Sequence, residues 1–234
     1  MSDTEKLLDA ALEHVVFDGW SEATFRAAVA DIGMDQDTAR ALCPRGAIDL
    51  AIAFHKRGDD QMVARLKREN LLSMRFRDRV AAGVKFRLEA VGEHKEAVRR
   101  GSTLFSLPQN AGEGAKLIWG TADKIWDALG DRSEDYNWYT KRAILSGVYG
   151  STVLFWLGDT SEDHEATWEF LDRRIENVMQ FEQLKAQVNN NPVASKLMVG
   201  PNWLLSKIRK PATMPDPDLP GHWSMASPEG DQKT

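Results

Sequence analysis

The chain has 234 residues, enough for a sizeable core, and 42% of them are hydrophobic and 28% charged, which is an ordinary balance for a globular protein. Its 35 acidic and 30 basic side chains give a net charge of −5, which argues against a chain that coats nucleic acid or anionic lipid along its whole length. The one cysteine, Cys43, excludes an internal disulfide framework and a cluster of thiolate metal ligands. The acidic start, Met1–Glu5, has none of the features of a targeting peptide.

The first 45 residues predict a helix-turn-helix-like subdomain. Apolar residues recur at helical spacing in three short segments, roughly 3–17, 21–32 and 36–42, and a longer helix follows over about 46–70. Three short helices followed by a long one is the order of a helix-turn-helix module that is joined to a helical body.

The same module carries the wrong charge for DNA. Residues 1–60 have twelve acidic and six basic side chains, and the third helix would bring Asp35, Asp37 and Arg40 to the groove. A helix that enters the major groove must neutralise phosphates with lysine and arginine. DNA binding is therefore disfavoured, although the order of the helices suggests it.

Residues 46–188 predict a helical body. Apolar stripes at helical spacing run through 76–91, 115–129 and 168–179, and a loop is expected over 101–114. The uncharged run 143–158 is too short and too rich in glycine and serine to span a membrane. That run predicts a buried helix or the wall of a cavity, and the absence of alternating strands predicts an all-α fold.

The last 46 residues divide at the polar break Asn189–Pro192. Residues 193–210 have a net charge of +4 and one tryptophan, a combination typical of a short interfacial helix. The alternative is a helix docked on the body. Residues 211–234 hold five prolines and no periodicity, and predict a disordered tail. The predicted membrane contacts are Leu197, Trp203, Leu204, Leu205, Lys207, Ile208, Arg209 and Lys210.

Catalytic and metal-binding motifs are missing from the sequence. The five histidines form no HExxH pair, no glutamate has a histidine three residues later, and no P-loop or GxSxG occurs. The run that starts at Gly112 lacks the third glycine of a dinucleotide-binding loop. The sequence therefore predicts a protein that is not an enzyme, with no catalytic residue, no metal and no cofactor.

Two adjacent aromatic residues, Trp138 and Tyr139, lie near Arg142 at the predicted start of a helix. Adjacent side chains on a helix point about 100° apart, so at least one of the two is expected near the surface. Tryptophan, tyrosine and arginine together are typical of an interface hot spot. Packing at the helix start is the alternative.

The chain resembles the ubiquinone (coenzyme Q) biosynthesis accessory lipid-binding proteins, the ninth Coq protein family. The motifs that carry the resemblance are Val84–Glu89, Asp135–Leu145 and Thr167–Ile175. The resemblance implies an all-α, TetR-regulator-like bundle that has lost DNA binding, a homodimer, and an apolar pocket for isoprenoid lipid or quinone intermediates in the C-terminal domain. Without a transit peptide, the chain is expected to be a bacterial form in the cytoplasm, peripheral on the inner membrane.

The resemblance also implies sites. A surface patch would present the quinone intermediate to the demethoxyubiquinone hydroxylase, and the 193–210 helix would contact the membrane surface. The patch positions in this chain are Asp123, Ile125, Trp126, Trp138, Tyr139 and Arg142. The residues expected to line the lipid pocket, chosen from the 115–129 and 143–158 helices, are Ile118, Val148, Tyr149, Thr152 and Phe155.

Two other functions remain open at this point. The first is a TetR-like transcriptional regulator with an apolar effector pocket, which the acidic third helix disfavours. The second is an enzyme whose site carries no recognisable motif.

Overall fold

A computed structural model describes residues 1–71, 73–133 and 136–189, and every regular element in these ranges is a helix. The all-α prediction is therefore confirmed for this part of the chain. Segments 193–210 and 211–234, with the predicted membrane contacts, lie outside the described residues. The helices are α1 (Asp3–Asp18), α2 (Glu22–Asp31), α3 (Gln36–Leu42), α4 (Ala47–Arg68), α5 (Phe76–Glu89), α6 (Lys95–Ser106), α7 (Ala111–Ala128), α8 (Tyr136–Gly158) and α9 (Glu165–Asn189), with short 3-10 turns at Gly92–His94 and Glu162–His164.

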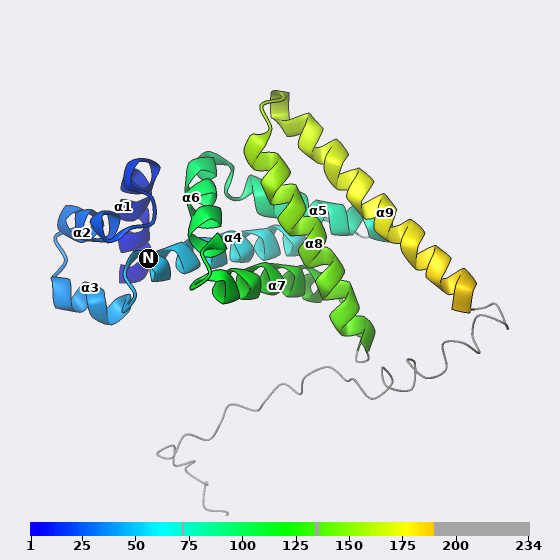
Figure 1. The fold of residues 1–234 in the computed structure, drawn as a ribbon, viewed down its shortest axis with the longest axis horizontal. Coiled ribbons are helices and arrows are strands. Elements are labelled where there is room, and N and C mark those ends of the chain that lie inside the picture. Colours follow the sequence, from blue (N-terminus) through cyan, green and yellow to red (C-terminus); the bar gives the residue numbers. More distant parts are fainter. Residues whose placement is uncertain (72, 134–135, 190–234) are drawn as a thin grey trace, which may run out of the picture.

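Side-chain caps begin the first three helices where the sequence places them. Ser2 and Glu5 form a reciprocal capping box on α1, and Ser21 and Asp35 accept hydrogen bonds from backbone N–H groups at the starts of α2 and α3. Such caps satisfy the otherwise unpaired N–H groups of the first turn. The three helices gather at one end of the molecule (Figure 1).

Helix α4 runs from this group into the body, where it packs against α5 and α7 (Figure 1). Helix α7 in turn packs on α8, and α8 on α9. Helices α5 and α7 approach closely at Gly83, where a Cβ atom would lie 2.9 Å from the Cγ2 of the buried Ile125. The body surrounds its core with helices that contribute one apolar face each.

The indole of Trp20 connects the N-terminal helices to the body. Its Nε1 donates a hydrogen bond of 3.0 Å to the carbonyl oxygen of Ala97 on α6. Trp20 is buried and its ring packs beside Phe54 of α4, with 5.8 Å between the ring centroids. This tryptophan therefore joins the first module to both α4 and α6.

The loop expected over 101–114 is wrong for most of that range. Helix α6 continues to Ser106 and α7 already begins at Ala111. Three glycines in this stretch weaken the helical pattern of the sequence. Packing explains the glycine at position 114, because a Cβ added there would lie only 2.8 Å from the Cβ of Phe105. The glycine therefore allows α6 and α7 to meet closely rather than marking a loop.

Candidate ligand cavity and surface cluster

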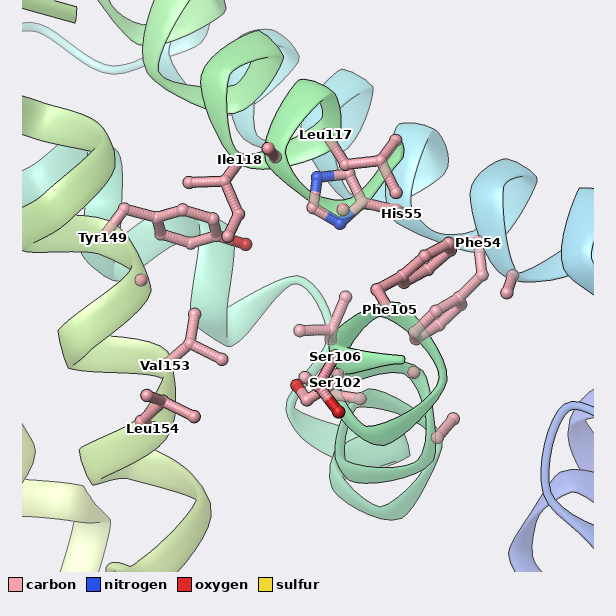
Figure 2. A pocket seen from close by; sticks show the side chains of 18 of the residues that line it. Phe54, His55, Ser102, Phe105, Ser106, Leu117, Ile118, Tyr149, Val153 and Leu154 are labelled. Carbon is pink, nitrogen blue, oxygen red and sulfur yellow. The ribbon is translucent and has the colours of Figure 1, made fainter. Parts of the chain in front are cut away.

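A cavity of about 410 Å³ lies among α4, α5, α6, α7 and α8, which is within the size range of small-molecule sites. Its walls are mainly apolar, and Figure 2 shows side chains from these helices pointing into it. The principal apolar lining residues are Phe54, Leu88, Phe105, Leu117, Ile118 and Val153.

The rim of the cavity lies between α6 and α8. Leu154 lines the cavity and is 68% exposed, and Ser102 and Ser106 face it from α6 (Figure 2). Leu154 therefore marks a part of the lining that is open to solvent. Gly114 and Phe105, where α6 and α7 meet closely, also belong to the lining.

The inner end of the cavity is polar and buried. The Nε of Arg87 donates to the carboxylate of Asp59 at 2.7 Å, and the hydroxyl of Thr121 donates to the same carboxylate at 2.8 Å. The Nε2 of His55 lies 2.9 Å from the Thr121 hydroxyl oxygen, and the Tyr149 ring lines the cavity with its centroid 5.9 Å from the guanidinium of Arg87. These side chains come from α4, α5, α7 and α8.

The protonation states leave this inner end without net charge. Burial, followed by the positive charge of Arg87, lowers the pKa of His55 to about 4, so the imidazole is neutral at pH 7. Burial raises the pKa of Tyr149, so its hydroxyl keeps its proton. Since Arg87 and Asp59 neutralise each other, the cavity is suited to a neutral ligand.

The predicted lipid-lining residues divide between several places. Ile118 and Tyr149 line the cavity, and Val148 lines a second cavity of about 270 Å³ among α5, α7, α8 and α9. Thr152 is buried and donates to the Val148 carbonyl at 2.7 Å. Phe155 stacks on Phe170, is 38% exposed and lies outside both linings. Lipid contact by any of the five stays a prediction.

The prediction missed the contributions of α4 and α6 to the cavity. His55 was passed over because a lone histidine without a second ligand carries no motif. The spacing of His55 and Asp59, four residues apart, was a usable signal, because such residues share one face of a helix.

The predicted partner-binding residues form a cluster around a buried arginine. Arg142 is fully buried, contacts Asp123, and donates to Asp127 at 3.0 Å and to Asp131 at 3.1 Å. Its guanidinium lies 4.0 Å from the ring centroid of Trp138. Asp123 and Asp127 lie four residues apart on α7, a spacing that could have identified Asp127 from the sequence, whereas Asp131 lies in the loop that follows the helix.

Only part of that predicted patch is accessible. Ile125 and Arg142 are fully buried, and Trp126 is buried and donates from its Nε1 to the Lys141 carbonyl at 3.1 Å. Trp138 is also buried, whereas Asp123 and Tyr139 are half-buried. Trp138 packs edge-on against Tyr139, with centroids 4.8 Å apart. A partner would therefore meet Tyr139 and Asp123 first, while partner binding itself stays a prediction.

Two kinds of feature are absent from the described residues. Among them, the structure shows no group of three histidine, cysteine, aspartate or glutamate side chains that is arranged to hold a metal ion. Within the same residues, none of the helices is both long enough and apolar enough to cross a bilayer.

The fold matches a solved structure of a TetR transcriptional regulator from Nitrosomonas europaea. The TM-score is 0.62 at 19% identity, over 75% of this chain and 97% of the regulator. At that identity the match concerns the fold alone. The predicted TetR-regulator-like fold is thereby confirmed.

The chain is also similar in sequence to curated proteins, over 79% to 88% of its length. The chain is 29% identical to the probable ubiquinone biosynthesis protein coq9, mitochondrial, of Dictyostelium discoideum, over 88% of this chain and 67% of that protein. It is 31% identical to the Rattus norvegicus COQ9 protein over 79% of this chain and 61% of the relative, and 29% identical to the Homo sapiens protein over 79% and 60%. The chain thus spans about two thirds or less of the length of these relatives.

The localisation predicted from the sequence is contradicted by these comparisons. A bacterial cytoplasmic protein was expected, yet the curated relatives from Dictyostelium, rat and human are all named as mitochondrial proteins. The acidic N-terminal residues on which the expectation depended are therefore a poor guide to location.

The predicted family resemblance is confirmed independently by a family model. Residues 111–182 match the COQ9 model, and this range contains α7, α8 and most of the described part of α9, with the Arg142 cluster. Residues 111–182 of the chain therefore match the COQ9 family model, and the chain is similar to the COQ9 ubiquinone biosynthesis proteins over most of its length.

Proposed function

We propose that the chain is a non-catalytic accessory protein of ubiquinone biosynthesis, which binds isoprenoid quinone intermediates in its cavity and presents them to the demethoxyubiquinone hydroxylase. The observation that carries the proposal is the apolar cavity of about 410 Å³, bordered on one side by the COQ9 domain. The names of the relatives supply the pathway.

The physical need for such a protein comes from the ligand. A polyprenyl quinone is almost wholly apolar, and each buried CH₂ group that is moved into water costs about 0.8 kcal/mol. A protein that handles the reactive ring must offer an apolar wall to the adjoining part of the tail. The cavity provides this wall through Phe54, Leu88, Phe105 and Ile118.

The other parts of the proposal rest on sequence features. The 193–210 segment, with Trp203 and three basic residues near its end, would contact the membrane surface, and a homodimer would be the working form. The hydroxylase would dock where Tyr139 and Asp123 reach the surface beside the Arg142 cluster. The division into a first module, a lipid-binding body and a C-terminal contact segment belongs to the same proposal.

DNA regulation, the alternative that the fold suggests, receives no support from α3. The guanidinium of Arg40 already pairs with Glu22 at 2.5 Å and lies over the Phe25 ring, 4.5 Å from its centroid. The remaining charges of α3 are Asp37 and the cap Asp35. This helix would bring negative charge to the phosphates.

Filling the cavity in cells tests the proposed role. Gly150 lines the cavity, where only Ile118 Cδ1 comes within 4 Å of an added Cβ, at 3.9 Å. Replacing the chromosomal copy with Gly150→Leu should lower cellular ubiquinone at least fivefold, because the leucine occupies the ligand's space. Ubiquinone would be quantified by liquid chromatography of lipid extracts.

The matched control is Gly147→Leu. Gly147 lies on the same helix, is exposed, and has nothing within 4 Å of an added Cβ. It should leave the ubiquinone content within about twofold of the parent. Equal ubiquinone in both strains, with both proteins folded and equally abundant, would contradict the proposed function of the cavity.

A further inference from the structure

The corner between α4 and α5 carries an excess of basic side chains. Residues 65–71 and 73–79 hold six basic and two acidic side chains, a net charge of +4 in a chain whose total is −5. The Leu71 N–H donates to the Glu69 carbonyl at 3.0 Å, and the Met74 N–H donates to the Leu71 carbonyl at 3.1 Å, so the chain turns tightly here. These two ranges are called the basic corner below.

Ion pairs within the protein neutralise only part of the basic corner. Two of its basic side chains are each paired with two carboxylates: Arg65 with Glu69 and Glu89, and Arg77 with Asp78 and Glu176. Arg75 also pairs with Asp78, but its side chain is 81% exposed, and exposed pairs contribute little. Within the described residues, no carboxylate lies within ion-pair distance of Lys67, Arg68 or Arg79.

Arg79 also has an unused hydrogen-bond donor. Its Nε is buried and has no hydrogen-bond partner among the described residues, and its guanidinium lies 5.3 Å from the centroid of the Phe76 ring. A buried donor without a partner costs free energy until an acceptor reaches it. Anionic oxygens of carboxylate or phosphate groups are the strongest acceptors for a guanidinium.

Two apolar side chains are exposed in the same corner, on either side of Arg75 in the sequence. Met74 is 37% exposed and Phe76 is 45% exposed. Phe76 also lines the second cavity, and its ring centroid lies 5.7 Å from that of Trp126 on α7. Apolar side chains among basic ones are typical of a surface that binds an anionic bilayer, because the apolar groups enter the acyl boundary while the basic groups meet phosphate.

We propose that the basic corner is a membrane contact on the folded body, separate from the 193–210 segment, and that Met74 and Phe76 enter the interface of an anionic bilayer there. The side chains that would bind lipid phosphates are Lys67, Arg68, Arg75 and Arg79. A bilayer is favoured over a protein partner because it offers a dense layer of phosphates directly above an apolar layer, which matches the alternation at positions 74–76. Two contacts on one chain reinforce each other, since the second binds as an intramolecular event. The bilayer would also meet the lining of the second cavity, to which Phe76 belongs.

A fluorescent label at the corner tests the contact directly. Ser73 is exposed, and Cys43 is 1% exposed, so an environment-sensitive thiol dye should react at the new cysteine of full-length Ser73→Cys. On vesicles of phosphatidylcholine and phosphatidylserine in equal amounts, its emission should shift to shorter wavelength. The control is Ala23→Cys, an exposed position on α2 at the other end of α4 (Figure 1), where the emission should stay unchanged.

Removing charge from the corner tests its share of the affinity. Each basic residue near an anionic surface contributes roughly fivefold in affinity, so the full-length variant Lys67→Gln/Arg68→Gln/Arg75→Gln should partition at least about tenfold less onto the same vesicles, measured by sedimentation. The control variant loses the same charge at three exposed positions on α2, α4 and α7, as Arg26→Gln/Lys56→Gln/Lys116→Gln. Its binding should stay within about threefold of the parent, because charges far from the surface are screened.

The proposal is refuted if the label on Ser73→Cys does not respond, or if the corner variant binds as tightly as its control. Either outcome leaves membrane contact by the 193–210 segment intact. A parent protein that ignores the anionic vesicles would overturn both contacts. Unchanged vesicle binding of the corner variant, combined with a loss of cellular ubiquinone, would assign the corner to a protein partner instead of a membrane.

Discussion

Replacing Arg142 with alanine is expected to lower the free energy of unfolding by about 3 kcal/mol, within the range for breaking a buried ion pair by removing one partner. The guanidinium is held among Asp123, Asp127 and Asp131, and the side chain of Asp131 is only 4% exposed. Burial by itself would raise the pKa of Asp131, but hydrogen bonds from Lys141, Ser133 and Arg142 outweigh it and lower that pKa to about 2. Without Arg142, a buried carboxylate keeps Lys141 as its one cationic partner in the described part of the chain.

The matched control for that variant is Arg173→Ala. Arg173 pairs with Glu169 across one exposed turn of α9, and such pairs contribute about 0.3–0.5 kcal/mol. Urea unfolding followed by circular dichroism gives both values. A loss below 1 kcal/mol for Arg142→Ala would show that the three aspartates do not depend on this arginine.

The second large effect is expected at the ion pair under the cavity. Asp59→Ala should destabilise the chain by about 3–5 kcal/mol, because it leaves the guanidinium of Arg87 buried and without its carboxylate. The side chains of both residues are less than 5% exposed. Arg87 is further confined by Gly58, where a Cβ would lie 2.7 Å from its Nη1.

The double variant Asp59→Leu/Arg87→Met distinguishes the loss of the ion pair from the cost of leaving the Arg87 guanidinium buried and unpaired. Replacing both charges with apolar side chains removes the desolvation cost, so the double variant should lose less than half as much stability as Asp59→Ala. Chemical denaturation at pH 7 measures both. If the double variant is as unstable as the single one, the lost stability does not come from an uncompensated charge on Arg87.

The N-terminal module and the helical body were predictable because their signals are local. Ser21 and Asp35 cap helices within three residues of their own positions, and the apolar stripe of 115–129 repeats within one helix. Helix α6 was harder to predict, since Ala97 is its single fully buried residue and Gly101 and Ser102 interrupt its apolar face.

The inner end of the cavity could not be predicted for a different reason. Asp59 meets Arg87 across 28 positions and Thr121 across 62 positions of the chain, and a contact of that separation leaves no periodic pattern. The Arg142 cluster was predictable only in part. The sequence placed Arg142 with the aromatic pair on a surface, whereas the structure buries it among Asp123 and Asp127 of α7 and Asp131 of the following loop.

The most direct test of the central claim is mass spectrometry of the lipid extracted from the purified full-length chain, beside the Gly150→Leu and Gly147→Leu variants. A cavity that holds an apolar ligand predicts a neutral, hydroxyl-bearing or quinonoid isoprenoid in near-stoichiometric amount in the parent protein and in Gly147→Leu. In Gly150→Leu the amount should fall to about a fifth or less. Equal lipid content in all three proteins, or no extractable lipid in the parent protein, would contradict a ligand-binding cavity among α4, α5, α6, α7 and α8.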